Sequence, residues 1–135
     1  MRDNVKVSAI QFAPSWLDCA RNAIRMAEWV EHEACLGADL VVFPELSNLG
    51  PVTPVRIGEN PGFDQNTSAY DFQVKYKKTA ESIPGPTTNM LAKLAHKLNV
   101  HIAVGLAQTH PDVTGTLYNS AVLIGPSFPM AIVIR

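Results

Sequence analysis

Runs of apolar and β-branched residues divide the chain into four expected strands. Val5 to Phe12 is rich in apolar and β-branched residues, and Val100 to Leu106 is a second such segment. Leu40 to Phe43 is wholly apolar, and a run of this kind is typical of a strand that is covered on both faces of a sheet. A fourth run, Leu117 to Ile124, comes after the turn-forming segment from His110 to Gly115, so we expect these last two strands to form an antiparallel hairpin.

Helical periodicity fills the interval between the first two strands. Apolar residues recur there at three- and four-residue steps and form one stripe: Ala20, Ala23, Ile24, Ala27, Val30 and Ala34. Asp18 is placed to cap the start of this helix, and Gly37 is placed to end it. The resulting strand–helix–strand unit predicts two parallel strands joined by a right-handed crossover.

The middle of the chain predicts a long loop followed by two helices. Glycines and prolines interrupt every periodicity between Ser47 and Asn66, whereas Ser68 to Ala80 can form a helix. After Pro84-Gly85-Pro86, Thr87 or Thr88 is available to cap a helix that Asn99 can end. The buried stripe of that helix consists of Leu91, Leu94, Ala95 and Leu98. The order β-α-β-loop-α-α-β-β predicts the α/β class with a mixed sheet.

Composition excludes several classes of partner. The 135 residues carry a formal net charge of −1, with 47% hydrophobic and 17% charged residues, which argues against a nucleic-acid interface. No apolar run approaches the roughly 20 residues that cross a bilayer, so no membrane partner is expected. Cys19 and Cys35 are too few for a disulfide framework and match no metal-ligand spacing. We therefore expect a cytoplasmic location.

One acidic residue occupies a position where catalytic side chains gather. Glu45 follows Phe43 and Pro44 at the carboxyl end of the second expected strand, where the long loop begins. A carboxylate there can act as a general base. Taken by position alone, however, a solvated acid at a strand-to-loop junction is the better interpretation.

Five ordered blocks of sequence change that balance. The blocks are Val7–Pro14, Gly37–Leu46, Ile83–Thr87, Val104–Gly105 and Tyr118–Pro126. In order and spacing they resemble the opening of the nitrilase, or carbon–nitrogen hydrolase, superfamily. The resemblance implies the N-terminal half of a four-layer α-β-β-α sandwich, which usually assembles into homo-oligomers.

The same resemblance implies a site built from a Glu, a Lys and a Cys. In the family the Cys attacks an amide, carbamoyl or nitrile carbon, the Glu is the general base and the Lys stabilises the tetrahedral intermediate. Glu45 matches the family's Glu, and Asn119 is expected to be a hydrogen-bonding residue beside it. No metal or organic cofactor is implied. The expected substrate is a small-molecule amide or N-carbamoyl amine, with a nitrile less favoured.

The family's Lys and Cys have no counterpart here. No lysine follows Lys97, and residues 127–135 depart from the basic motif that carries the family's Lys. We therefore divide the chain into a partial hydrolase domain, residues 1–126, and a divergent tail, residues 127–135. Cys19 and Cys35 are interpreted as ordinary helix residues rather than nucleophiles.

These features predict an inactive chain, either a truncated or a frameshifted hydrolase. The alternative is a non-catalytic short form that associates with a full-length homologue. A flavodoxin-like nucleotide-binding module explains the α/β alternation but none of the five blocks. Half a sandwich also leaves a sheet face uncovered, so we expect self-association, and the apolar tail from Met130 to Ile134 can add a strand to the sheet edge.

Overall fold

The chain alternates strands and helices in the predicted order and adds a strand near its end. The computed structural model describes residues 4–51, 68–127 and 131–133. Its elements are β1 (Val7–Ala9), α1 (Cys19–Cys35), β2 (Leu40–Val42), α2 (Ala69–Thr79), α3 (Pro86–Leu98), β3 (His101–Thr109), β4 (Leu117–Ile124) and β5 (Ala131–Val133). Of the predicted loop from Ser47 to Asn66, residues 52–66 lie outside the described residues.

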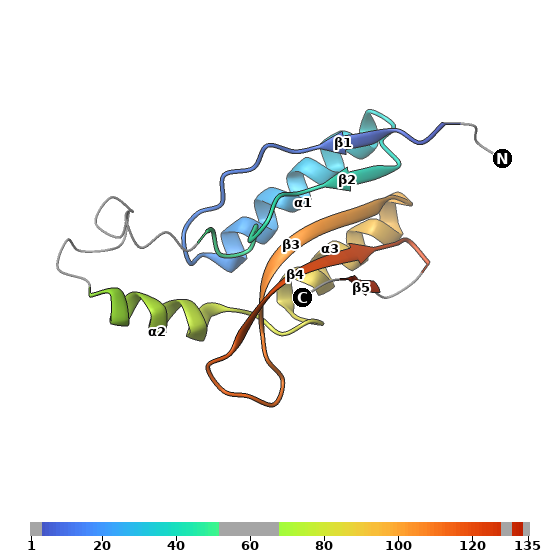
Figure 1. The fold of residues 1–135 in the computed structure, drawn as a ribbon. Helices are drawn as coiled ribbons and strands as arrows, with labels where there is room; N and C mark the ends of the chain where they lie inside the picture. The colour runs from blue at the N-terminus through green and yellow to red at the C-terminus, as the bar shows by residue number, and fades with distance from the viewer. Residues whose placement is uncertain (1–3, 52–67, 128–130, 134–135) are drawn as a thin grey trace.

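The described strands form a five-stranded mixed sheet in the order β1-β2-β3-β4-β5 (Figure 1). β1, β2 and β3 are parallel, whereas β4 and β5 are antiparallel to their neighbours. The predicted hairpin of β3 and β4 is confirmed, with Gly105 opposite Ala121 and Ala107 opposite Asn119. The α/β class and the mixed sheet are therefore confirmed. β1 is shorter than the predicted strand from Val5 to Phe12, since it pairs only with the three residues of β2.

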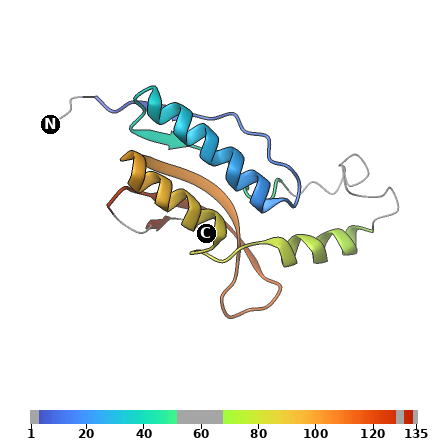
Figure 2. The same ribbon diagram turned by 180° about the vertical axis from the view of Figure 1, so that it is seen from behind.

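Helices α1 and α3 cover one face of this sheet and lie side by side (Figure 2). Their inward residues pack against the alternate strand positions that face them, and the apolar contact holds the two layers together. The centre of this core consists of Met26, Val30, Leu91, Ala95, Val41, Ile102, Val104, Val122 and Ile124.

The buried stripe of α1 differs from the predicted one. Asp18 caps the helix by accepting a hydrogen bond from the Arg21 backbone N–H at 3.0 Å, and Gly37 follows the helix at φ 85°, both as expected. Ile24, however, is 52% exposed, whereas Asn22 is fully buried. Apolar character alone misplaced the stripe, because the buried face includes a polar side chain whose hydrogen bonds are satisfied inside the protein.

The start of α3 also differs from the prediction. Its N-cap is Gly85, not Thr87 or Thr88, which lie inside the first turn. A Cβ on Gly85 would stand 2.2 Å from the Ser82 carbonyl oxygen, so this close approach requires glycine. The Gly85 N–H donates to the Thr88 hydroxyl at 2.9 Å, so the threonine still satisfies a backbone group at the helix start. Asn99 ends the helix, as predicted, and adopts the left-handed conformation.

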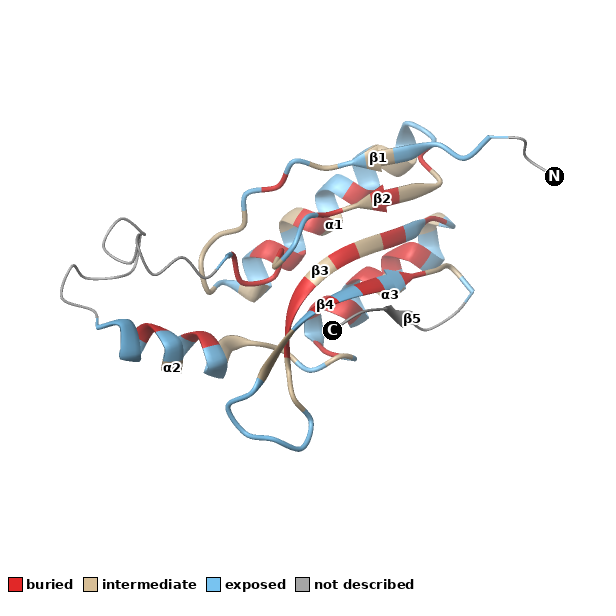
Figure 3. Cartoon of the chain, in the orientation of Figure 1, coloured by how far each residue is buried: buried red, intermediate tan, exposed pale blue. Residues whose placement is uncertain are grey.

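No helix among the described residues covers the opposite face of the sheet. Side chains on this face alternate with the buried core positions along each strand. Apolar residues predominate on it: Val7, Ala9, Leu40, Val42, Ala103, Ala121 and Leu123. We call these residues the open face. Figure 3 shows β1 and parts of β4 in the exposed and intermediate colours, in contrast to the buried residues along β3.

Candidate active site

Glu45 begins a tight turn at the carboxyl end of β2. Leu46 adopts a left-handed conformation, with φ 52°, which turns the chain sharply after the Phe-Pro-Glu block. The Gly50 N–H then donates to the Leu46 carbonyl oxygen at 2.8 Å and closes the turn. The structure thus places Glu45 where the sequence analysis put it, with its carboxylate exposed.

The turn is fastened to β3 through its backbone. The Ser47 N–H donates to the Gly105 carbonyl oxygen at 2.7 Å, and the Gly105 N–H donates to the Pro44 carbonyl oxygen at 3.3 Å. A Cβ on Gly105 would stand 2.6 Å from the Glu45 Cα. The absence of a side chain at Gly105 is therefore what lets β3 approach the backbone of Glu45 so closely.

Two buried asparagines, Asn48 and Asn22, also fix this turn through their side-chain hydrogen bonds. The side chain of Asn48 accepts from the Ala107 N–H at 2.9 Å and donates to the Ala107 carbonyl oxygen at 3.1 Å. Asn22 of α1 donates to the Asn48 carbonyl oxygen at 2.8 Å and to the Ser15 carbonyl oxygen at 2.7 Å. The Asn48 amide thus takes the place of a strand partner for Ala107, and the Asn22 amide satisfies carbonyl groups of the chain around the turn. The sequence analysis missed both, because nothing in their spacing marks an asparagine that will be buried.

Helix α2 packs against the far end of the turn. Phe72 and Tyr76 lie one helical turn apart and are both buried, in a cluster with Leu49 and Ala107. The Tyr76 hydroxyl donates to the Gly50 carbonyl oxygen at 2.9 Å. Phe72 is therefore part of this core, whereas Tyr70 of the same helix is exposed.

Asn119 of β4 reaches across the sheet to the candidate base. Its side-chain amide donates a hydrogen bond to the Glu45 carboxylate oxygen Oε1. Both residues line a hollow of about 370 Å³ on the open face, together with Val42, Ala103, Gly105 and Ala121. The expected hydrogen-bonding role of Asn119 beside the site is thus matched by a direct contact.

Neither cysteine lines this hollow. The Cys19 thiol donates to the Thr79 carbonyl oxygen at 3.5 Å, and burial, followed by the nearby carboxylates of Glu81 and Asp18, raises its pKa to about 12. A position in the first turn of a helix therefore does not activate this thiol, because burial outweighs the helix dipole. Cys35 is exposed in the last turn of α1.

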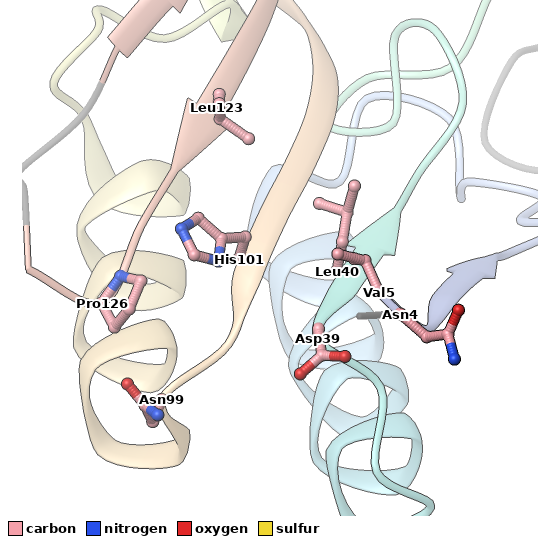
Figure 4. A pocket seen from close by; sticks show the side chains of 8 residues that line it. All are labelled: Asn4, Val5, Asp39, Leu40, Asn99, His101, Leu123 and Pro126. Carbon is pink, nitrogen blue, oxygen red and sulfur yellow. The ribbon is translucent and has the colours of Figure 1, made fainter. Parts of the chain in front are cut away.

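A larger hollow, of about 570 Å³, lies at the opposite end of the parallel strands. Asp39 and Leu40 border it on one side, and His101 and Pro126 border it on the other (Figure 4). Asp39 and His101 stand apart across this hollow, and Asp39 accepts a hydrogen bond from the Lys6 backbone N–H at 3.0 Å. The two hollows are therefore distinct, and the one with the candidate base is at the carboxyl ends of the strands.

Within residues 4–51, 68–127 and 131–133, no three His, Cys, Asp or Glu side chains gather in a metal-binding group. The helices of the same residues include none that combines the length and apolar character needed to span a membrane.

A mixed sheet with a carboxylate at the carboxyl end of a parallel strand defines the class: an α/β protein with a candidate site at the carboxyl ends of its parallel strands. The model of the carbon–nitrogen hydrolase family matches residues 6–131, and the chain belongs to this family.

Known relatives agree with this membership. The chain is 32% identical over 125 residues to a nitrilase of Pyrococcus abyssi, covering 90% of this chain and 39% of the relative. It is also 32% identical over 127 residues to a bromoxynil-specific nitrilase of Klebsiella pneumoniae subsp. ozaenae, covering 92% of this chain and 33% of the relative. The chain thus spans between a third and two-fifths of the length of these relatives.

A solved structure shows the same fold. The protein XC1258 of Xanthomonas campestris, a CN-hydrolase superfamily protein with an arsenic adduct in its active site, superposes with a TM-score of 0.67 at 19% identity. The superposition covers 97% of this chain and 40% of that chain. The expected fold, a part of the family's layered sandwich, is therefore confirmed.

Proposed function

We propose that this chain supplies the general base of a thiol-dependent hydrolase that cleaves carbon–nitrogen bonds in small molecules. Glu45 is the base, and the hydrogen bond from Asn119 to its carboxylate is the single observation that supports the proposal most directly. A carboxylate at a defined position and orientation is what proton transfer requires, since general-base catalysis depends first on geometry.

The proposed reaction needs two further groups. A Cys thiol gives its proton to Glu45 and attacks the substrate carbon, and a Lys stabilises the negative charge that develops there. We propose that both come from outside these 135 residues, because the resemblance assigns neither to a residue printed here. With an amide, Glu45 then returns the proton to the leaving nitrogen, and the water that it activates next releases the acid product. With a nitrile, the proton goes to the nitrogen of the thioimidate that forms, one water adds before ammonia leaves, and a second water releases the acid.

The proposed substrate class is based on the names of two relatives. Both are nitrilases, one specific for bromoxynil, so we propose a nitrile as the first substrate to test. Amides and N-carbamoyl amines, which the sequence analysis placed ahead of nitriles, form the comparison panel. The hollow beside Glu45 has an apolar wall of Val42, Ala103 and Ala121, which suits the uncharged body of such molecules.

The test begins by sequencing the gene past the codon for Arg135 and translating all three frames. A product that includes a downstream Lys and Cys block is then assayed for ammonia release from a nitrile, an amide and an N-carbamoyl amine. We expect Glu45→Gln to lower kcat/KM by at least about a hundredfold, because the neutral amide cannot accept the thiol proton. Glu28→Gln, an exposed acid on α1, is the matched control and is expected to leave the rate unchanged.

Three results would contradict the proposal. Ammonia release by the 135-residue chain alone would mean that the nucleophile lies within it. Full activity of the Glu45→Gln product would mean that Glu45 is not the base. If no family-like sequence follows in any frame and the chain co-purifies with a longer homologue at fixed stoichiometry, the non-catalytic partner form replaces the enzyme.

A further inference from the structure

The contact between Asn119 and Glu45 joins two parts of the chain that are 74 residues apart in sequence. Glu45 lies in the turn after β2, and Asn119 lies on β4, with β3 between them. The orientation of the amide is fixed by chemistry, because an ionised carboxylate only accepts hydrogen bonds and so requires the Asn119 nitrogen, not its oxygen.

The strands hold both ends of this contact in place. Asn119 is opposite Ala107 in the register of β3 and β4, and Ala107 is the residue whose N–H and carbonyl are both bonded by the side chain of Asn48. Glu45 is three residues before Asn48, and its backbone lies close to Gly105, which is on β3 like Ala107. β3 therefore holds both the candidate base, Glu45, and the hydrogen-bond donor, Asn119, in fixed positions.

We propose that Asn119 is the positioning residue of Glu45, an inference that rests on the proposed function. Its amide binds Oε1 and leaves Oε2 as the oxygen that takes the proton from the attacking thiol. The S–H bond breaks, the proton goes to Oε2, and the sulfur electron pair forms the new S–C bond. One π bond of the substrate's carbonyl or nitrile group breaks at the same time, and its electron pair moves to the oxygen or nitrogen. Asn119 exchanges no proton and touches no reacting atom in this step.

The amide also restrains a flexible side chain. A glutamate on a turn with an exposed carboxylate samples several rotamers, and only a few of these direct an oxygen toward a fixed thiol. A charge-assisted bond to a strand residue selects among them. A displacement of the reacting groups by about 1 Å can cost about a hundredfold in rate, so orientation matters even where the bond adds little stability.

The kinetic test uses the same downstream-extended product as the Glu45→Gln experiment. We expect Asn119→Leu, which keeps the size of the side chain but removes the donor, to lower kcat by about ten- to a hundredfold. KM should remain within about twofold, because the residue does not bind substrate. Asn119→Gln retains an amide and should recover part of the loss. Asn89→Leu, an exposed amide on α3, is the matched control and should leave kcat unchanged.

A spectroscopic test on the 135-residue chain needs no activity. In ¹⁵N-labelled protein the side-chain NH₂ signals of Asn119 should shift as the pH is lowered, because protonation of the carboxylate weakens the bond. The shift should be absent in Glu45→Gln. An Asn119 signal that ignores pH, or one that responds equally in Glu45→Gln, would show that the contact is not made and would overturn the proposal.

The two proposals fail in different ways. If Glu45→Gln is inactive while Asn119→Leu keeps its full kcat, Glu45 remains the base and the positioning role is wrong. If the loss in Asn119→Leu falls on KM alone, Asn119 binds substrate and the positioning role is again wrong. If both variants keep full activity, the proposed function falls as well.

Discussion

Individual residues around Glu45 are selected for size and hydrogen bonding rather than for apolar character. Gly105 is needed because β3 approaches the turn backbone, and Asn48 is needed because the backbone of Ala107 has no strand partner on that side. Both residues act on Glu45 through the backbone. The position of the carboxylate is therefore a property of its neighbours as much as of the strand that carries it.

A methyl group at Gly105 tests this dependence. In Gly105→Ala the new Cβ would stand 2.6 Å from the Glu45 Cα and 2.8 Å from the Pro44 carbonyl oxygen, both backbone atoms. The turn must move, and we expect the free energy of unfolding to fall by about 1–3 kcal/mol, as for other overpacked sites. Urea unfolding followed by circular dichroism measures the change.

Gly125→Ala provides the matched control for that experiment. A Cβ there would stand 3.3 Å from the His101 side chain, which can adjust, so a much smaller loss is expected. Equal unfolding midpoints for the two alanine variants would mean that the turn at Glu45 yields without cost, and that Gly105 does not fix it.

At the scale of elements, α2 meets α1 and the turn through two groups that must remain protonated. Burial raises the pKa of the Cys19 thiol and of the Tyr76 hydroxyl to about 12 in each case. The thiol donates to the last residue of α2, and the hydroxyl donates to Gly50 at the end of the turn. Losing either proton charges a group inside the contact between these elements.

This arrangement predicts a loss of stability at alkaline pH. A group whose pKa is higher in the folded than in the unfolded protein stabilises the fold fully below the unfolded pKa, and the benefit is lost as the pH rises toward the folded pKa. The unfolded values are about 9.0 for Cys19 and 10.0 for Tyr76, so the urea midpoint should decline between about pH 9 and pH 12.

Two variants separate this effect from general alkaline damage. Tyr76→Phe should lower the midpoint at neutral pH, because the Gly50 carbonyl loses its donor, but should flatten the decline above pH 9. Tyr70→Phe changes an exposed tyrosine and should leave the decline as steep as in the parent chain. A slope that is the same in all three proteins would contradict the assignment.

At the scale of the whole molecule, the open face is an apolar surface that no helix among the described residues covers. Leu40 and Val42 belong to a run whose composition is typical of strands covered on both faces, yet described helices cover one face only. Val7 is 53% exposed and Leu123 is 39% exposed on the other face. An apolar sheet face of this kind favours association with another surface.

Self-association through this face is therefore expected of the 135-residue chain. Size-exclusion chromatography with light scattering should give a mass above the 14.7 kDa of one chain. Leu123→Lys places a charge on the open face and should shift the distribution toward the monomer, since a buried unpaired charge opposes association. Val113→Lys changes another exposed apolar residue, in the hairpin turn, and should have no effect. A parent chain that is already monomeric would refute the expectation.

The sequence predicted the order of the helices and strands better than it predicted contacts between residues that are far apart in the chain. Element order, the hairpin, both ends of α1 and the carboxyl-end position of Glu45 follow from hydrophobic runs and turn residues, because these depend on neighbours within a few positions. The site followed in part: Glu45 and Asn119 were identified through family-like blocks, but their hydrogen bond links residues far apart in sequence.

Tertiary structure decided which of several suitable residues is buried or caps a helix, where the sequence pattern fits more than one. It buried Asn22 in place of Ile24 because the turns beside α1 needed an amide partner, and it moved the cap of α3 to Gly85 because the preceding chain passes too close for a side chain. It set the high pKa of Cys19, since burial outweighs the helix dipole. By itself the sequence determined which segments become strands and helices and where the acid stands; packing decided what each of those side chains touches.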